Sequence, residues 1–298
     1  MRRLVLSVLY LCLCVASSLA SGSVVVKKDA VSSKVRFVFF AGLEGSGHHG
    51  INSAYKKCGV MCAIANAVTQ ELYAGGSTPH GAFVYGDQTD KQIRARRAAA
   101  IDAFRRVEAE HGSGPARLVF VNGGAGLDKL QNKSGEMSYP NYAGPNKVLH
   151  SPDVTVLARL AEDAGVDLRV VVLRRGAEDI LRSTTMHRHF GSEAHEAAVL
   201  AESAAYLAAQ LRMLDPAFVE CVTIDALFRD GVRALDALLW GGAEFPRGAK
   251  VGGESRRLLL KSEVERRNDI DPDSVFVDHL GAYIAGIDDA CESAARRA

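Results

Sequence analysis

Short apolar runs without polar alternation recur along this chain of 298 residues, and a segment with helical spacing follows each of them. Strands that are apolar on both faces and alternate with helices are typical of a parallel sheet covered on both sides. The sequence therefore predicts one α/β domain, a parallel sheet flanked by helices. The expected strands are residues 35–41, 82–85, 118–121, 168–173 and 218–224, and the expected helices are residues 51–73, 93–111, 153–164, 177–186, 192–214, 226–240 and 274–297.

Charge and hydropathy exclude several classes of protein. The chain has 36 Lys and Arg against 35 Asp and Glu, 48% hydrophobic residues and a mean hydropathy of +0.01. A disordered tail or an acidic scaffold would carry fewer apolar residues and a larger net charge. A net charge of +1 gives no general attraction to nucleic acid or to an anionic membrane. Any anion must therefore be bound at a local site.

The first twenty residues have the pattern of a targeting segment. Met1-Arg2-Arg3 is basic, residues 4–15 are mostly apolar, and Ser18-Leu19-Ala20 supplies the small residues of a cleavage site. We expect residues 1–20 to be a secretory signal peptide, with a retained short signal-anchor as the alternative. Residues 21–33 would then be a linker and residues 34–298 the folded domain. The expected location is the secretory pathway, in the Golgi lumen or outside the cell.

Four cysteines lie outside this segment, at Cys58, Cys62, Cys221 and Cys291. In an oxidising compartment they allow two disulfides with three possible connectivities. Plain core thiols are the alternative, because Cys58 and Cys62 lie four residues apart in a helical pattern. The sequon Asn132-Lys133-Ser134 in a polar loop predicts a glycoprotein.

The sharpest local motif is the glycine-rich run at residues 42–50, Gly-Leu-Glu-Gly-Ser-Gly-His-His-Gly, between the first strand and the first long helix. Glycines at such a turn let backbone N–H groups converge on an anion, and a helix N-terminus adds partial positive charge. The motif therefore predicts a phosphate site. Gly42 and Gly47 fit the nucleotide-hydrolase pattern, but His48 replaces its lysine and His49 replaces its metal-holding hydroxyl.

A second motif follows the strand at residues 168–173. Arg175 emerges at the carboxyl end of this strand, and Ser183 lies eight residues further on, within the next helix. Because ligands of open parallel sheets bind at the carboxyl ends of the strands, we expect Arg175 to share an edge with the glycine-rich run. A guanidinium can hold a phosphate with two parallel bonds, and a serine hydroxyl can complete the grip.

Together the two motifs resemble those of the sulfotransferases that use 3′-phosphoadenosine 5′-phosphosulfate (PAPS). In that family a glycine-bearing loop holds the 5′-phosphosulfate, and an Arg with a Ser eight residues later holds the 3′-phosphate. Asp179 stands at the usual acidic position, and residues 223–228 match a strand–acid–helix element. The resemblance implies a P-loop-like fold, a secretory-pathway member, and PAPS as the sulfuryl donor without a metal. The residues that it implies for nucleotide binding are Gly45, Ser46, Gly47, His48, His49, Arg175 and Ser183.

The chain departs from the family at the point where charge is most needed. Family members place Lys or Arg just before the loop's Ser/Thr-Gly, whereas this chain has Gly45. We expect His48 to donate to the phosphosulfate in its place. For the base that takes the acceptor's proton, Glu71 is the first candidate. Glu44 competes with it, as does His150, which closes the long irregular stretch at residues 122–151.

The expected acceptor is a hydroxyl or amine of a glycan or a protein. Nucleic acid is not an expected partner, and a membrane is one only if the N-terminal segment is retained.

The rival functions are a nucleotide-dependent kinase on the same fold and a non-catalytic nucleotide- or glycan-binding relative. A metal site at His187-Arg188-His189 is disfavoured because no third ligand is evident. The run Arg94, Arg96, Arg97, Arg105 and Arg106 is a solvated helix face or an attraction for an acidic acceptor.

Overall fold

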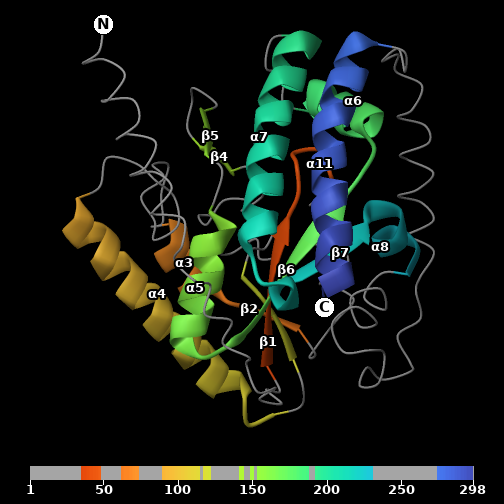
Figure 1. The fold of residues 1–298 in the computed structure, drawn as a ribbon. Helices are drawn as coiled ribbons and strands as arrows, with labels where there is room; N and C mark the ends of the chain where they lie inside the picture. The colour runs from red at the N-terminus through yellow and green to blue at the C-terminus, as the bar shows by residue number, and fades with distance from the viewer. Residues whose placement is uncertain are drawn as a thin grey trace, which may run out of the picture. The chain divides into compact units, whose positions relative to one another are not determined.

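The helices of this protein pack against a five-stranded parallel sheet (Figure 1). The structure is a computed structural model that describes residues 35–47, 62–73, 89–114, 117–121, 141–143, 148–150, 153–187, 192–230 and 274–297. All of these residues belong to one compact unit, Ser33–Ala298. Within the described ranges, no helix is long and apolar enough to cross a membrane.

The order of the strands in the sheet is β2-β3-β1-β6-β7, and every pairing in it is parallel. The strands β4 and β5 form a separate antiparallel pair. The strands are β1 Val35–Ala41, β2 Cys62–Ile64, β3 Arg117–Phe120, β4 Asn141–Ala143, β5 Val148–His150, β6 Asp167–Arg174 and β7 Val219–Thr223. The helices are α3 Asn66–Tyr73, α4 Asp90–His111, α5 Val154–Ala164, α6 Ala177–His187, α7 Glu193–Met213, the 3-10 turn η2 Pro216–Phe218, α8 Ile224–Asp230 and α11 Val275–Arg297.

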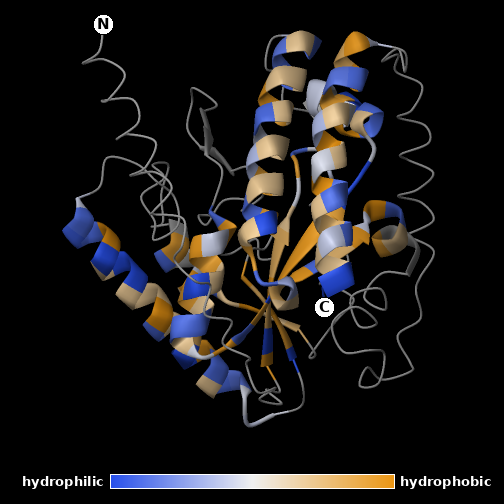
Figure 2. Ribbon diagram, in the orientation of Figure 1, coloured by the Kyte–Doolittle hydropathy of each residue, from blue (hydrophilic) through white to orange (hydrophobic). Residues whose placement is uncertain are grey.

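Both faces of the sheet are buried. On one face, Phe37 and Phe39 of β1 join a core with side chains of α3, α4, α5, α6, α7 and α11. On the other face, Val38 and Phe40 of the same strand are also fully buried. Figure 2 shows the strands as hydrophobic and much of α4 as hydrophilic. Strands that are apolar on both sides need cover on both sides, so the predicted α/β fold with a parallel sheet is confirmed.

The helix boundaries follow from local capping groups. Thr89 and Gln92 form a capping box at the start of α4. The Asp153 carboxylate accepts from two backbone N–H groups at the start of α5, and Ser192 accepts from one at the start of α7. Gly165 ends α5 with a φ of 76°, a backbone conformation that suits glycine.

Three sequence predictions need correction or restriction. The helix expected at residues 51–73 is wrong in part, because Cys62–Ile64 is a strand that pairs with β3 and the helix there is α3. The irregular stretch at residues 122–151 contains the strands β4 and β5. The strand expected at residues 82–85 lies outside the described residues, as does most of the helix expected at residues 226–240.

A disulfide joins the last strand of the sheet to the last helix. Cys221 of β7 and Cys291 of α11 are bonded, with their Cα atoms 6.0 Å apart and a sequence separation of 70. Cys62 is disulfide-bonded as well, and its partner lies outside the described residues. The sequence left disulfides and free core thiols as alternatives, and Cys62, Cys221 and Cys291 form disulfides.

A group of charged side chains lies on β1, β6 and β7, toward the amino ends of β1 and β6. Arg36 Nε donates to Asp167 Oδ2 at 2.8 Å, and Arg169 Nη2 lies 3.8 Å from Asp167 Oδ1. Burial lowers the pKa of the Arg169 guanidinium and raises the pKa of the nearby Glu220 carboxyl. This group lies near the amino ends of β1 and β6, whereas the glycine-rich run follows the carboxyl end of β1. Its role is therefore structural, because the Arg36–Asp167 pair joins β1 to β6.

Candidate anion site at the carboxyl edge of the sheet

The strand order places a candidate site between β1 and β6. The chain leaves β1 toward β2 on one side of the sheet and leaves β6 toward β7 on the other. The two strands are neighbours, with Ala41 at the end of β1 paired with Val172 of β6. In open parallel sheets, ligands bind outside the carboxyl ends of the strands, at the point where connections from neighbouring strands run to opposite sides of the sheet. The run after β1 and the residues after β6 meet at this point.

The described part of the glycine-rich run, Gly42–Gly47, is a tight loop. Ser46 N donates to the Leu43 carbonyl oxygen at 2.9 Å, which closes a turn. Gly45 has a φ of 81° and Gly47 has a φ of 99°, so both adopt conformations that other residues rarely adopt. Left-handed residues within such a turn point successive N–H groups to one side, which is the arrangement that binds anions.

The Ser46 side chain is unusual within this loop. It is fully buried, and its Oγ has no hydrogen-bond partner among the described residues. A Cβ atom at Gly42 would lie 2.6 Å from this oxygen, so the hydroxyl packs directly over Gly42. A buried hydroxyl without a partner costs free energy, and most buried polar groups have one. Among the described residues, the Ser46 hydroxyl is thus a donor without a partner inside the loop.

Arg175 joins the loop to the helix that follows β6. Its Nη1 donates to the Gly45 carbonyl oxygen at 2.7 Å. Its Nε lies 3.7 Å from Asp179 Oδ2, in the first turn of α6. The two motifs that the sequence separates by 130 residues are therefore in direct contact.

Helix α6 also packs against the underside of the loop. Thr184 Oγ1 donates to the Ile180 carbonyl oxygen at 2.9 Å and lies 3.4 Å from the Glu44 carbonyl oxygen. A Cβ atom at Gly45 would lie 2.7 Å from the Ile180 carbonyl oxygen. Ser183, which the resemblance implies for the 3′-phosphate, is half-buried on the same helix. Sequence reasoning named Ser183 and missed Thr184, although the two are adjacent.

The first turn of α6 carries a small ionic network. Arg182 is nearly buried, and its guanidinium contacts Glu178 and lies 3.2 Å from Asp179 Oδ1. Asp179 thus lies between the guanidinium groups of Arg175 and Arg182. This carboxylate holds Arg175 in place, because opposite charges on adjacent turns favour one another.

The structure separates the two candidate carboxylate bases. Glu71 of α3 lies 3.6 Å from Arg96 of α4, so its side chain faces α4. Glu44 belongs to the loop itself and is 8% exposed. Glu44 directly precedes Gly45, whose carbonyl oxygen accepts from Arg175, whereas the described ion pair of Glu71 is with α4. The role of either residue as a base stays a prediction.

Several predicted site residues cannot be placed. His48, His49, Arg188 and His189 lie outside the described residues, and the side chains of His150 and His187 are not described. Among the described residues, no group of three or more His, Cys, Asp or Glu side chains is arranged to hold a metal ion.

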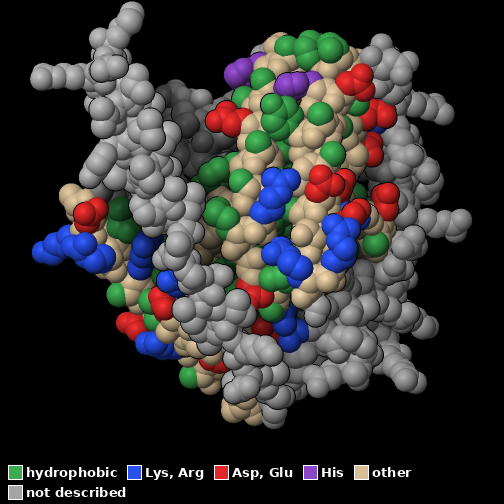
Figure 3. Space-filling model, in the orientation of Figure 1, with side chains coloured by type: hydrophobic (Ala, Val, Ile, Leu, Met, Phe, Trp, Pro, Cys, Tyr) green, Lys and Arg blue, Asp and Glu red, His purple; other side chains and the backbone are tan. Residues whose placement is uncertain are grey.

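Lys and Arg side chains are visible over the surface of α4 (Figure 3), and the contacts of its arginines differ. Arg105 Nη2 donates to the Asp163 carbonyl oxygen at 2.7 Å, so it satisfies the carboxyl end of α5. Arg94 and Arg106 are exposed on the helix surface. Part of the basic run is therefore structural, and attraction of an acidic acceptor by the remainder stays a prediction.

Comparison with known proteins adds little to this description. A scan against protein-family models and a search of curated proteins found no match to the chain. Among solved structures, the sulfotransferase domain from the Synechococcus PCC 7002 olefin synthase is similar at 12% sequence identity and a TM-score of 0.42, covering 84% of this chain and 94% of that chain. A likeness this distant carries no argument about activity.

The close approach of Gly45 to α6 gives a testable prediction. Gly45→Ala is expected to destabilise the protein by about 2–5 kcal/mol. A left-handed alanine costs about 1–2 kcal/mol, and the clash of its Cβ with the Ile180 carbonyl oxygen adds about 1–3 kcal/mol. Gly165→Ala is the matched control, since Gly165 has a similar φ of 76° but no atom within 4 Å of the added Cβ. It should lose only about 1–2 kcal/mol. Urea denaturation of both variants measures the difference, and equal losses would show that the loop does not pack on α6.

Proposed function

We propose that this protein is a PAPS-dependent sulfotransferase of the secretory pathway that sulfates a hydroxyl or amine of a glycan or a protein. The observation that carries the proposal is the hydrogen bond from Arg175 to the Gly45 carbonyl. It joins the two segments that resemble the phosphosulfate loop and the 3′-phosphate segment of that family. The buried Ser46 hydroxyl, which has no partner in the described part of the chain, and the left-handed glycines support an anion at this point.

In this proposal the loop and α6 hold the two ends of the nucleotide. The loop N–H groups, the Ser46 hydroxyl and His48 would bind the 5′-phosphosulfate, and Arg175 and Ser183 would bind the 3′-phosphate. When bound, PAPS supplies the sulfuryl group, and 3′,5′-ADP leaves with the electrons of the broken sulfur–oxygen bond. A carboxylate base takes the proton of the acceptor. Catalysis then depends on orientation and on neutralising the charge of the leaving phosphate.

The cysteines support the compartment that we propose. Disulfides persist in secretory and extracellular compartments and are rare in the cytosol. Cys221, Cys291 and Cys62 are all disulfide-bonded. With the apolar N-terminal segment, this favours the Golgi lumen or the extracellular space.

Ligand-dependent thermal stability tests the proposal. The secreted full-length protein should be stabilised by roughly 5–10 °C at a 3′,5′-ADP concentration of about 100 Kd, as ligand linkage requires for a domain of this size. ATP with Mg²⁺ should give a much smaller shift, because His48 and His49 replace the lysine and the hydroxyl of the nucleotide-hydrolase pattern.

A transfer assay then separates the remaining alternatives. The protein is incubated with PAPS carrying radiolabelled sulfur and with mixed glycan and protein acceptors, and the label on the acceptors is counted. Transfer supports the proposed reaction. Stabilisation by ATP and Mg²⁺ alone would instead identify a kinase, and binding of 3′,5′-ADP without any transfer would identify a non-catalytic relative.

A further inference from the structure

We propose that helix α11 positions Arg175 for nucleotide binding, through an ion pair between Asp288 and Arg174 that the Cys221–Cys291 disulfide holds in register. This inference rests on the proposed function, because it assigns a purpose to the residues behind the proposed nucleotide site. It makes Asp288 a positioning residue that acts through the backbone of β6.

Arg174 and Arg175 leave the end of β6 in different directions. Arg174 is the last residue of the strand, and its Nη1 lies 3.2 Å from Asp288 Oδ1 of α11. Arg175 follows directly, and its Nη1 donates to the Gly45 carbonyl oxygen. Consecutive Cα atoms are about 3.8 Å apart, so any displacement of Arg174 moves Arg175 as well.

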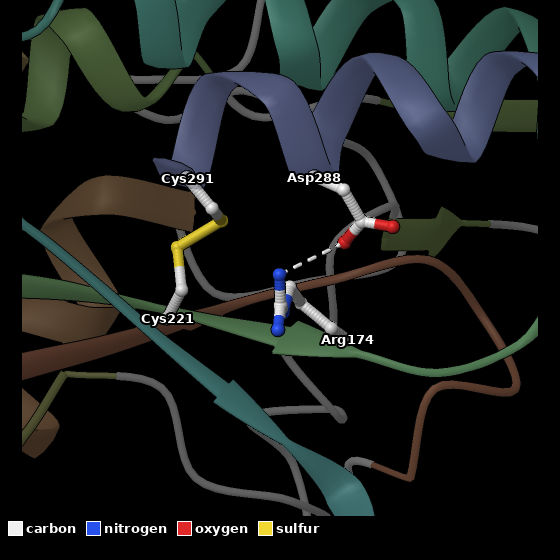
Figure 4. Close-up of a disulfide and its surroundings, with 4 residues drawn as sticks. All are labelled: Arg174, Cys221, Asp288 and Cys291. Atoms are coloured by element: carbon white, nitrogen blue, oxygen red, sulfur yellow. Dashed lines mark ion pairs between the residues drawn. A yellow bond between two sulfur atoms is a disulfide. The ribbon is translucent and has the colours of Figure 1, made fainter. Parts of the chain in front are cut away.

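The disulfide lies next to this ion pair. Cys291 and Asp288 are three residues apart and therefore lie on the same face of α11. Cys221 pairs with Val172 in the sheet, and the next pairs along lead to Arg174 beside Thr223. Figure 4 shows the two links together, the disulfide to β7 and the ion pair to β6, both made by one stretch of α11.

Packing against α7 fixes the rest of α11. The helices lie side by side (Figure 1), and Arg212 Nη2 of α7 donates to the Gly286 carbonyl oxygen at 3.3 Å. A Cβ atom at Gly286 would lie 3.6 Å from the Ala208 Cβ, so the two helices approach closely here. The segment of α11 that carries Asp288 is therefore held in place by the disulfide and by α7, and we call it the rigid support.

The rigid support explains how a partly exposed ion pair can matter. The side chains of Arg174 and Asp288 are 31% and 43% exposed, and pairs of this kind usually contribute little when both partners are mobile. The disulfide and the bond from Arg212 hold the backbone on either side of Asp288, so less backbone freedom is lost when the ion pair forms. Among the described residues, Asp288 is the carboxylate within ion-pair distance of the Arg174 guanidinium, and Arg174 Nε is buried there without a hydrogen-bond partner.

The test compares Asp288→Asn with a matched control on the same helix. Glu292→Gln removes an acidic group that is 62% exposed and lies 3.5 Å from Arg296, on α11 itself. Affinity for 3′,5′-ADP is measured by calorimetry. Asp288→Asn should bind about 2- to 5-fold more weakly than wild type, the range expected for one ion pair, and Glu292→Gln should bind like wild type. Asp288→Glu, which keeps the charge, should recover most of the affinity.

Hydrogen exchange of peptides covering residues 42–47 and 168–176 gives a readout that needs no ligand. Exchange in both peptides should accelerate about threefold or more in Asp288→Asn and stay unchanged in Glu292→Gln, while urea midpoints of the two variants agree. If Asp288→Asn matches the control in exchange, or in affinity, the positioning role is wrong. If wild type binds no 3′,5′-ADP, the proposed function fails, and the exchange data alone decide whether α11 restrains the end of β6.

Discussion

Replacing Arg175 with alanine is expected to weaken binding of 3′,5′-ADP by roughly 10- to 100-fold, because charge-assisted hydrogen bonds to a phosphate contribute about 1.5–3 kcal/mol. The variant also loses the bond to the Gly45 carbonyl, which removes one of the contacts between the loop and α6. Titration calorimetry of the purified variant measures the loss of affinity directly.

Two further variants show whether the loss is specific. Arg175→Lys keeps the charge but loses the planar pair of donors, so its affinity should fall between those of wild type and Arg175→Ala. Arg159→Ala is the control for loss of an exposed arginine, since Arg159 is 76% exposed on α5 and lies 3.8 Å from Glu162. If Arg175→Ala binds 3′,5′-ADP as tightly as Arg159→Ala, Arg175 is not part of the nucleotide site.

Removing the Cys221–Cys291 disulfide is expected to lower the free energy of unfolding by about 4 kcal/mol. Closing a chain segment of 70 residues restricts the unfolded state by about this amount in the chain-entropy description. The variant is Cys221→Ala with Cys291→Ala, and urea denaturation under non-reducing conditions gives the free energy. Both positions are at least partly buried, so part of the loss will come from packing.

Comparison with reduced wild type separates this disulfide from that of Cys62. A reducing agent breaks both, so reduced wild type should be no more stable than the double alanine variant measured without reductant. A double variant with the urea midpoint of oxidised wild type would show that the cross-link does not restrain the unfolded chain.

The elements with strong local patterns were predictable. The strand expected at residues 35–41 is β1 with the same bounds, and the strand expected at residues 168–173 is β6, one residue longer at each end. Both are apolar runs bounded by polar residues or glycines. The strand β2 was not predictable, because three residues inside a helical spacing form a strand only through their parallel pairing with β3, which is remote in sequence.

The candidate site was also predictable only in part. The strand-to-helix position of Arg175 and the glycines indicated a shared edge, and strand order brings them into contact. No sequence motif indicated the roles of Thr184 and Asp288 or the pairing of Cys221 with Cys291. Their roles depend on which helix packs on which strand, and cysteine spacing alone leaves the connectivity open.

Gly45 limits which side chains this loop can carry while α6 stays in place. It occupies the position at which the resembling sulfotransferases carry a basic residue, yet any side chain there would meet the backbone of α6 at 2.7 Å from its first carbon. A lysine at this position would therefore require α6 to move away from the loop. In the structure, the positive charge beside Gly45 is the guanidinium of Arg175, which follows β6.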